Sequence, residues 1–366
     1  MKLLIIPSGG IKLDGITSSI FNYYRLFNRK EISTTFIDTK TLNNKNDAGL
    51  FIQEVENNGD EIVYISRNSN PIRYFLQLVK IMRKNRYDIV HVHGSSSLLS
   101  VELLAAKISG IKVRIVHSHN TTCNHKILNA ILKPLFNILP THRVACGQDA
   151  GKWLYGNKNF QVIRNGIDIK KYQFNEASRI EVRKQLGVTD KKVIGHIGNF
   201  NSQKNHSFLI DIFSELLQLD DYVLILIGDG IKKTEMESKA KNLGIQDKIL
   251  FLGKRTDVPR LLHVMDIMVL PSFYEGLPLV TVEWQSAGLY TIVADTVTEE
   301  IKLTDLIVFK SLNDSPAEWA KTIDLLSNNN RSSKVSSIKN TEYDINKSAD
   351  TLINLYKNLY QLNAPY

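Results

Sequence analysis

The segment PSFYEGLPLVTVE, residues 271–283, follows the apolar run IMVL at 267–270. The apolar run is typical of a buried strand, and the Gly and Pro residues after it favour a turn. A helical pattern begins directly after this turn, so the amides of Gly276–Val280 would be the free N–H groups of a helix N-terminus. Such amides bind phosphates and anionic oxygens. The segment therefore predicts a strand, a loop and a helix that present Glu275 and Glu283 beside an anion site.

The same alternation of strand and helix signals continues on both sides of this segment. Short β-branched runs are separated by stretches of helix length, which predicts parallel sheets. The runs lie at 3–6, 35–38, 61–65, 88–93, 112–117, 143–146, 192–197, 222–227, 249–252, 267–270 and 290–294. Ligands of open α/β sheets bind beyond the carboxyl ends of the strands. We therefore predict an α/β protein with two Rossmann-like domains that face a central cleft.

The boundaries follow from turn and composition signals. The turn signal NGID closes a first domain at 1–168, and a polar, lysine-rich connection with one helix follows at 169–190. The second domain spans 191–343 and contains an irregular stretch rich in Asn, Ser and Lys at 328–340. Residues 344–366 place apolar side chains at helical spacing, which predicts a final amphipathic helix.

The positive charge of the chain is concentrated in one half. The net charge is +9, yet residues 1–168 carry 22 Lys and Arg against 12 Asp and Glu, and the remainder carries 24 against 25. Two segments, 72–84 and 125–136, mix cations with large apolar side chains, as interfacial helices do. The first of them is equally typical of an ordinary sheet-covering helix. We expect an anionic membrane surface as a partner and, without a binding motif, no nucleic acid.

Cysteine usage and hydropathy indicate the compartment. Cys123 and Cys146 have no paired spacing, which argues against a disulfide framework or a zinc cluster. The first apolar run is too short for a signal peptide, and no stretch approaches ~18 apolar residues. We therefore expect a cytoplasmic protein that is peripheral on the inner face of the cell membrane.

The residues around Glu275 and Glu283 resemble the signature of the retaining family 4 glycosyltransferases, and the resemblance covers nearly the whole chain. It implies the two-domain glycosyltransferase-B fold, in which the last helix crosses back onto the first domain. It also implies that Glu275 holds hydroxyls of the donor sugar and that Glu283 holds the ribose of the nucleotide. The donor site would include the residues between them, Gly276, Leu277, Pro278 and Leu279.

A second element, HIGNFNSQKNH at 196–206, resembles the family's Gly-Arg…Lys element, whose two cations neutralise the donor diphosphate. Lys204 matches the lysine. Asn199 stands where arginine is usual, so one positive charge is missing, and Arg255 or a cation of the first domain is a candidate to compensate.

Two further strand ends complete the expected donor site. The resemblance places LIGDG at 226–230 near the nucleotide, with Gly228 as a donor contact, and FLGKRTDVP at 251–259 near the base, with Lys254 and Arg255 as contacts. The glycines of the first loop are equally well explained as turn residues that need a positive φ. No Gly-x-Gly-x-x-Gly or Walker-type loop occurs, which removes the usual dinucleotide and NTPase functions.

In the first domain, the family's Gly-Gly pair approaches the donor phosphate. We assign this role to Gly15, which directly precedes a helix, in preference to Gly9-Gly10, and Asp14 departs from the usual glycine. A histidine often lies near the reacting sugar in this family. We favour His119 over His117 as an orienting or proton-handling group, and we expect His91 and His93 to be structural.

The chain contains no Asp-x-Asp element, so we predict a metal-independent reaction without a cofactor. The resemblance implies a retaining transfer of a hexose from a nucleotide donor, with UDP favoured. The expected acceptor is a lipid-linked saccharide in capsular or exopolysaccharide biosynthesis. Two alternatives stay open at this point, a sugar-nucleotide 2-epimerase of the same fold and a non-catalytic partner protein that retains the architecture.

Overall fold

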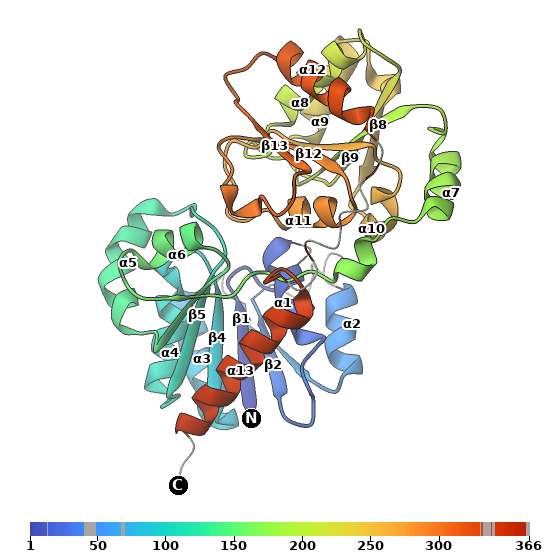
Figure 1. The fold of residues 1–366 in the computed structure, drawn as a ribbon. Coiled ribbons are helices and arrows are strands. Elements are labelled where there is room, and N and C mark those ends of the chain that lie inside the picture. Colours follow the sequence, from blue (N-terminus) through green and yellow to red (C-terminus); the bar gives the residue numbers. More distant parts are fainter. Residues whose placement is uncertain are drawn as a thin grey trace. The chain divides into compact units, whose positions relative to one another are not determined.

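The computed structural model describes residues 1–12, 14–39, 49–66, 70–329, 331, 338 and 341–363. The chain divides into two compact units, Met1–Ile167 with Glu342–Tyr366, and Asp168–Thr341. Each unit contains one parallel sheet with helices packed on it (Figure 1). The predicted α/β fold with two Rossmann-like sheets is confirmed.

The first unit is built on a seven-stranded sheet of order β3-β2-β1-β4-β5-β6-β7. The central strands are buried on both faces, which explains why they are apolar runs without alternation. The strands are β1 (Lys2–Pro7), β2 (Ser33–Asp38), β3 (Glu61–Tyr64), β4 (Ile89–Gly94), β5 (Val113–Ser118), β6 (His142–Ala145) and β7 (Gln161–Val162). The strand order reverses between β1 and β4, and such a switch point is where open α/β sheets bind ligands.

Helices cover both faces of this sheet, and each face has its own apolar core. On one face lie α1 (Gly15–Tyr24), α2 (Gly49–Asn57) and α13 (Ile345–Asn363); on the other lie α3 (Pro71–Asn85), α4 (Ser100–Ile108), α5 (Lys126–Ile138) and α6 (Gln148–Tyr155). Figure 1 shows α13 lying beside α1. Its residues Ala349, Leu352 and Tyr356 are buried in the core of the first unit, so the predicted return of the last helix is confirmed.

The second unit repeats the arrangement with a six-stranded sheet of order β10-β9-β8-β11-β12-β13. Its strands are β8 (Lys192–Ile197), β9 (Tyr222–Ile227), β10 (Ile249–Gly253), β11 (Ile267–Leu270), β12 (Tyr290–Ala294) and β13 (Ile307–Lys310). Its helices are α7 (Glu176–Leu186), α8 (His206–Leu216), α9 (Lys233–Asn242), α10 (Val258–Leu262), α11 (Leu279–Ser286) and α12 (Pro316–Ser327). The switch point of this sheet lies between β8 and β11.

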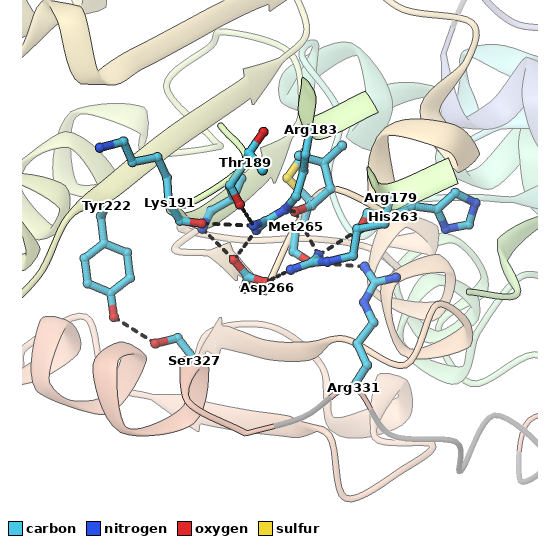
Figure 2. A network of polar contacts seen from close by, with 12 residues as sticks. Arg179, Arg183, Thr189, Lys191, Tyr222, His263, Met265, Asp266, Ser327 and Arg331 are labelled. Carbon is cyan, nitrogen blue, oxygen red and sulfur yellow. Dashed lines mark hydrogen bonds and ion pairs between the residues drawn. The ribbon is translucent and has the colours of Figure 1, made fainter. Parts of the chain in front are cut away.

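The segment 169–190 is more ordered than the connection that its polar composition suggests. It forms the 3-10 turn η3 (Ile169–Tyr172) and α7, and it groups with the second unit. Figure 2 shows the cause: Arg179 and Arg183 of α7 both bind the Asp266 carboxylate, at 2.5 and 2.6 Å. The backbone N–H of Val193 donates to the same carboxylate at 2.7 Å, so one acid joins α7 to two strands. The one helix predicted in this connection is therefore present as α7, and a charged face rather than an apolar one holds it to the second unit.

Every predicted strand is present, with ends shifted by at most two residues. Two edge strands, β7 and β13, were missed, because β7 has only two residues and only the first of the four residues of β13 is buried. The predicted irregular stretch 328–340 lies mostly outside the described residues.

Candidate functional site

The two loops that follow β8 and β11 lie at the switch point of the second sheet, and they bring two predicted site residues together. Lys204 Nζ lies 2.6 Å from Glu275 Oε1, and the two side chains are only 14 and 8% exposed. Gln203 Nε2 donates to the other carboxylate oxygen of Glu275 at 3.0 Å and to the carbonyl of Tyr274 at 3.0 Å. Gln203 was not among the site residues predicted from the sequence. Its position directly before the site lysine was the available signal.

Glycines of the neighbouring β9 loop hold the backbone of the lysine loop. Gly228 has φ +144°, and a Cβ there would lie 2.0 Å from the carbonyl oxygen of Gly198; Gly230, with φ +155°, is similarly close to Phe200. Only glycine fits such a contact at positive φ. Close backbone packing is sufficient to explain glycine at position 228, without a contact to the donor. This packing supports the site indirectly, because it fixes the loop that carries Lys204.

Helix α11 begins at Leu279, as its sequence predicts, and its N-cap Pro278 offers no capping side chain. Gly276 and Leu277 lead into this N-terminus, where the first amides of a helix attract anions. Glu283 lies one turn into the helix and is half-buried. Burial raises the pKa of its carboxyl to about 7, and a hydrogen bond from Tyr172 of η3 opposes this rise. The structure thus places a carboxyl that is easily protonated beside the anion-attracting helix end.

The other predicted cations, Arg255 and Lys254, are exposed. Arg255 is exposed and forms a two-pronged ion pair with Asp257, at 2.8 and 2.7 Å, so its charge is compensated within its own loop. Lys254 is also exposed, and Asn199 is exposed on the loop after β8. The hypothesis that Arg255 supplies the charge missing at Asn199 would therefore require it to leave Asp257.

In the first unit, Gly15 is the first residue of α1, and Asp14 caps the helix by accepting from the Thr17 N–H at 2.8 Å. A Cβ added at Gly15 would meet nothing within 4 Å, so packing does not require glycine there. Gly10 differs, because its φ is +71° and a Cβ would lie 2.4 Å from Asp38 Oδ1. The fold thus requires glycine at position 10. It does not require glycine at position 15, so a requirement there would have to come from a bound ligand.

His119 lies just beyond β5 and belongs to a stack of four buried histidines with His91, His93 and His117. His119 Nε2 lies 2.9 Å from Nδ1 of His93. Burial lowers the pKa of His119 to about 3, so the ring is neutral at pH 7. The H-x-H pattern that ends both strands was visible in the sequence, but its consequence, direct contact among four rings, was not predicted.

Comparison with known proteins decides the family. Residues 15–171 match the family model "Glycosyltransferase Family 4", and residues 178–343 match "Glycosyl transferases group 1". This chain is a family 4 glycosyltransferase. The family resemblance predicted from the residues around Glu275 and Glu283 is thereby confirmed.

Relatives and solved structures agree with this assignment. The glycosyltransferase is 29% identical to the putative glycosyltransferase EpsF of Bacillus subtilis, over 97% of this chain and 96% of that protein. It is 28% identical to the UDP-Gal:alpha-D-GlcNAc-diphosphoundecaprenol alpha-1,3-galactosyltransferase of Escherichia coli, over 61% of this chain and 62% of the relative. A crystal structure of Anabaena HepE with UDP-glucose has the same fold, with a TM-score of 0.80 and 20% identity, over 98% of this chain and 100% of that one.

Membrane attachment was a further expectation. No helix within the described ranges combines the length and the apolar character needed to cross a bilayer.

Proposed function

We propose that this glycosyltransferase transfers a hexose from a UDP-sugar to a lipid-linked saccharide, with retention of configuration and without a metal ion. The observation that carries the proposal is the contact between Lys204 and Glu275, beside the N-terminus of α11. An ammonium group, a carboxylate and helix amides at one switch point offer the charges that a diphosphate and sugar hydroxyls require.

Each group has a defined task in this proposal. Lys204 and the first amides of α11 stabilise the diphosphate as it departs, because they are preorganised donors aimed at developing negative charge. Glu275 accepts hydrogen bonds from sugar hydroxyls, and Glu283 accepts them from the ribose. Lys254 and Arg255 face the base, the Gly15 backbone approaches the phosphate, and His119 orients the transferred sugar.

The chemistry is a front-face substitution. The oxygen of the acceptor hydroxyl forms a bond to the anomeric carbon while the bond from that carbon to the diphosphate oxygen breaks. The acceptor proton passes to the departing phosphate oxygen, so UDP leaves and the configuration is retained. No enzyme nucleophile or metal enters this scheme.

Three relatives support the choice of substrates. The Escherichia coli relative is named for a UDP-galactose donor and a diphosphoundecaprenol acceptor, and HepE was crystallised with UDP-glucose. The Vi polysaccharide biosynthesis protein VipC/TviE of Salmonella typhi is 32% identical over 37% of this chain. We therefore place the reaction in the assembly of a surface polysaccharide.

The first unit provides a surface for the membrane on which a lipid-linked acceptor resides. On α5, Ile127, Ile131 and Ile138 are 80, 66 and 68% exposed, and Phe136 is its one buried residue. This unit also holds the excess of Lys and Arg. Exposed apolar side chains on a basic surface favour an anionic bilayer. Binding to phosphatidylglycerol vesicles, but not to phosphatidylcholine vesicles, and its loss in Ile131→Glu would test this step.

The function itself is tested by incubating purified protein with labelled UDP-sugars and a polyprenyl-diphosphate saccharide. We expect labelled lipid product and free UDP with the wild type, and neither with Glu275→Ala. Exchange of the sugar H2 with solvent in the absence of acceptor would instead indicate a 2-epimerase. A complete lack of turnover and of nucleotide-induced thermal stabilisation would favour a non-catalytic protein.

A further inference from the structure

One glutamine connects the two loops that carry Lys204 and Glu275. The backbone carbonyl of Gln203 accepts a hydrogen bond from the Phe273 N–H at 2.9 Å. Its side-chain nitrogen Nε2 donates to the carbonyl of Tyr274 at 3.0 Å and to Oε2 of Glu275 at 3.0 Å. Gln203 therefore binds three consecutive residues of the loop after β11, and it does so through both its main chain and its side chain.

The partners of the side chain determine which way its amide group points. A carbonyl and an ionised carboxylate accept hydrogen bonds, whereas the two N–H groups of an amide nitrogen donate them. The opposite orientation of the Gln203 amide would place its oxygen against two acceptors. Both N–H groups of Nε2 are therefore used, one toward the carbonyl of Tyr274 and one toward the carboxylate of Glu275.

This geometry restrains Glu275 at both ends of its side chain. The carbonyl of Tyr274 belongs to the same peptide group as the backbone nitrogen of Glu275, so binding it restrains the backbone from which the side chain extends. The bond to Oε2 restrains the carboxylate itself. A glutamate side chain otherwise populates several rotamers and loses entropy when it is ordered. One amide group therefore orders the carboxylate in the free protein.

The other carboxylate oxygen of Glu275 has a different donor, because Lys204 Nζ lies 2.6 Å from Oε1. In the proposed function, this ammonium group binds the diphosphate and the carboxylate binds hydroxyls of the sugar. A phosphate attracts an ammonium group strongly, because both groups are charged. A neutral amide whose two N–H groups are already used has no comparable attraction to phosphate. The two donors of Glu275 therefore differ in how readily a diphosphate can draw them away.

We propose that Gln203 is a positioning residue for recognition of the donor sugar. Its amide keeps the Glu275 carboxylate in place when Lys204 turns to the diphosphate, so that Oε1 becomes available to a sugar hydroxyl. This inference rests on the proposed function, which supplies the ligand of each group. Gln203 acts through Glu275 and needs no contact of its own with the substrate. Its removal should therefore affect binding of the sugar and leave binding of the nucleotide intact.

The restraint on Glu275 can be measured without any substrate. Gln203→Leu removes both side-chain bonds and keeps the backbone bond to Phe273, so the two loops stay joined. We expect crystals of the free wild-type protein to show one orientation of the Glu275 carboxylate, and crystals of Gln203→Leu to show several orientations or a displaced one. Several orientations in the wild type, or the wild-type orientation alone in Gln203→Leu, would overturn the proposal, whether or not UDP-sugar turnover is found.

Calorimetric titration separates recognition of the sugar from recognition of the nucleotide. The ligands are UDP and the UDP-sugar that the wild type turns over. A hydrogen bond to a charged group corresponds to a factor of about 10–100 in affinity, so Gln203→Leu should bind the UDP-sugar at least about tenfold more weakly. Its affinity for UDP should stay within about 3-fold of the wild type, because Lys204 and its loop are retained. Equal losses for both ligands would mean that the side chain only holds the loops together, which contradicts the proposal.

A second variant tests the charge of the positioning group. Gln203→Glu has nearly the same shape, but it places a carboxylate against the Tyr274 carbonyl and the carboxylate of Glu275. Acceptors and like charges repel at this distance, so the variant should lose at least as much affinity for the UDP-sugar as Gln203→Leu. Wild-type affinity for the UDP-sugar in Gln203→Glu would contradict the assigned role of the amide.

The matched control is Gln185→Leu on α7, which removes a bond of the same kind and length, from Gln185 Nε2 to Glu181 Oε1 at 3.0 Å. It should bind both ligands within about 2-fold of the wild type, because surface substitutions have small effects. Wild-type turnover with an unaffected Gln203→Leu would refute the role of Gln203 alone. A wild type that binds no UDP-sugar would instead refute the proposed function, and the role of Gln203 in sugar recognition with it.

Discussion

Two groups of polar side chains lie at the carboxyl ends of strands in this protein, and they solve the problem of burial in opposite ways. In the second unit, the side chains of Lys204 and Glu275 form an ion pair at 2.6 Å. In the first unit, four histidines are buried without an acidic partner among the described residues and lose their charge instead. In the proposed function, Lys204 and Glu275 manage the charge of the donor, whereas the neutral histidines add no charge to it.

The largest expected effect comes from breaking the charged group. Glu275→Ala removes the acceptor for sugar hydroxyls and leaves Lys204 and Gln203 without their carboxylate. We expect kcat/KM to fall by about 10²–10⁴-fold, because preorganised electrostatic contacts of this kind dominate catalysis. The exposed Glu235→Ala on α9 is the control and should match the wild type. Activity within 3-fold of wild type in Glu275→Ala would separate this charged pair from the reaction.

A second test determines whether the ion pairs of Asp266 with Arg179 and Arg183 contribute to stability or to catalysis. Asp266 holds Arg179 and Arg183, and Asp266→Asn leaves both guanidinium groups under-paired. Breaking a buried pair costs about 3–5 kcal/mol, and the partial exposure of these groups reduces this to about 2–4 kcal/mol.

Urea unfolding measures this loss. Asp257→Asn, which breaks an exposed pair with Arg255, is the control and should cost about 0–1 kcal/mol. A loss of kcat in Asp266→Asn at temperatures where the protein stays folded would contradict a purely structural role for this network.

Glu283 and the stacked histidines should respond to pH in opposite directions. The pKa of Glu283 rises from 4.5 to about 7 on folding, so its contribution to stability is complete below pH 4.5 and is lost as pH rises through 7. The pKa of His91 and of His119 falls from 6.5 to about 3, so their contribution is complete above pH 6.5 and is lost as pH falls toward 3.

Hydrogen exchange between pH 5 and 8 measures the histidine response, and thermal melting over the same range measures the response of Glu283. Strands β4 and β5 should lose protection on acidification, once rates are corrected for intrinsic pH dependence. The melting temperature of the wild type minus that of Glu283→Gln should fall as pH rises from 5 to 8. A pH-independent difference would mean that Glu283 titrates normally in the folded state.

The smallest expected effect distinguishes a glycine required by the fold from one required by a ligand. Gly15→Ala should change the free energy of unfolding by less than about 1 kcal/mol, because its Cβ meets open space. Gly10→Ala should cost about 1–3 kcal/mol, because its φ of +71° is strained for alanine. Calorimetry measures both changes. An unchanged donor KM in Gly15→Ala would argue against the assigned approach of its backbone to the phosphate.

Sequence patterns were sufficient for the fold where burial dictates composition. The apolar runs of β4 and β11 and the helical spacing of Leu352 and Tyr356 allow few other structures. Patterns were insufficient for the short edge strands β7 and β13. They predicted a helix within 169–190, but not the arginines that hold α7 to Asp266.

The candidate site shows the same limit. The motif placed Lys204 and Glu275 at two strand ends, and the structure brings them into contact. Gln203, the partner Tyr172 of Glu283 and the contact of His93 with His119 depend on side-chain packing between segments distant in sequence. Such contacts leave no periodic signal in a single sequence.

The central claim is that Glu275 recognises the sugar of the donor while Lys204 recognises its diphosphate. Calorimetric titration of the wild type and Glu275→Gln with UDP and with the UDP-sugar that the wild type turns over tests it most directly. We predict that Glu275→Gln binds UDP as tightly as the wild type and loses at least about tenfold in affinity for the UDP-sugar, or about 1.4 kcal/mol. An equal affinity of both proteins for the UDP-sugar would contradict the account.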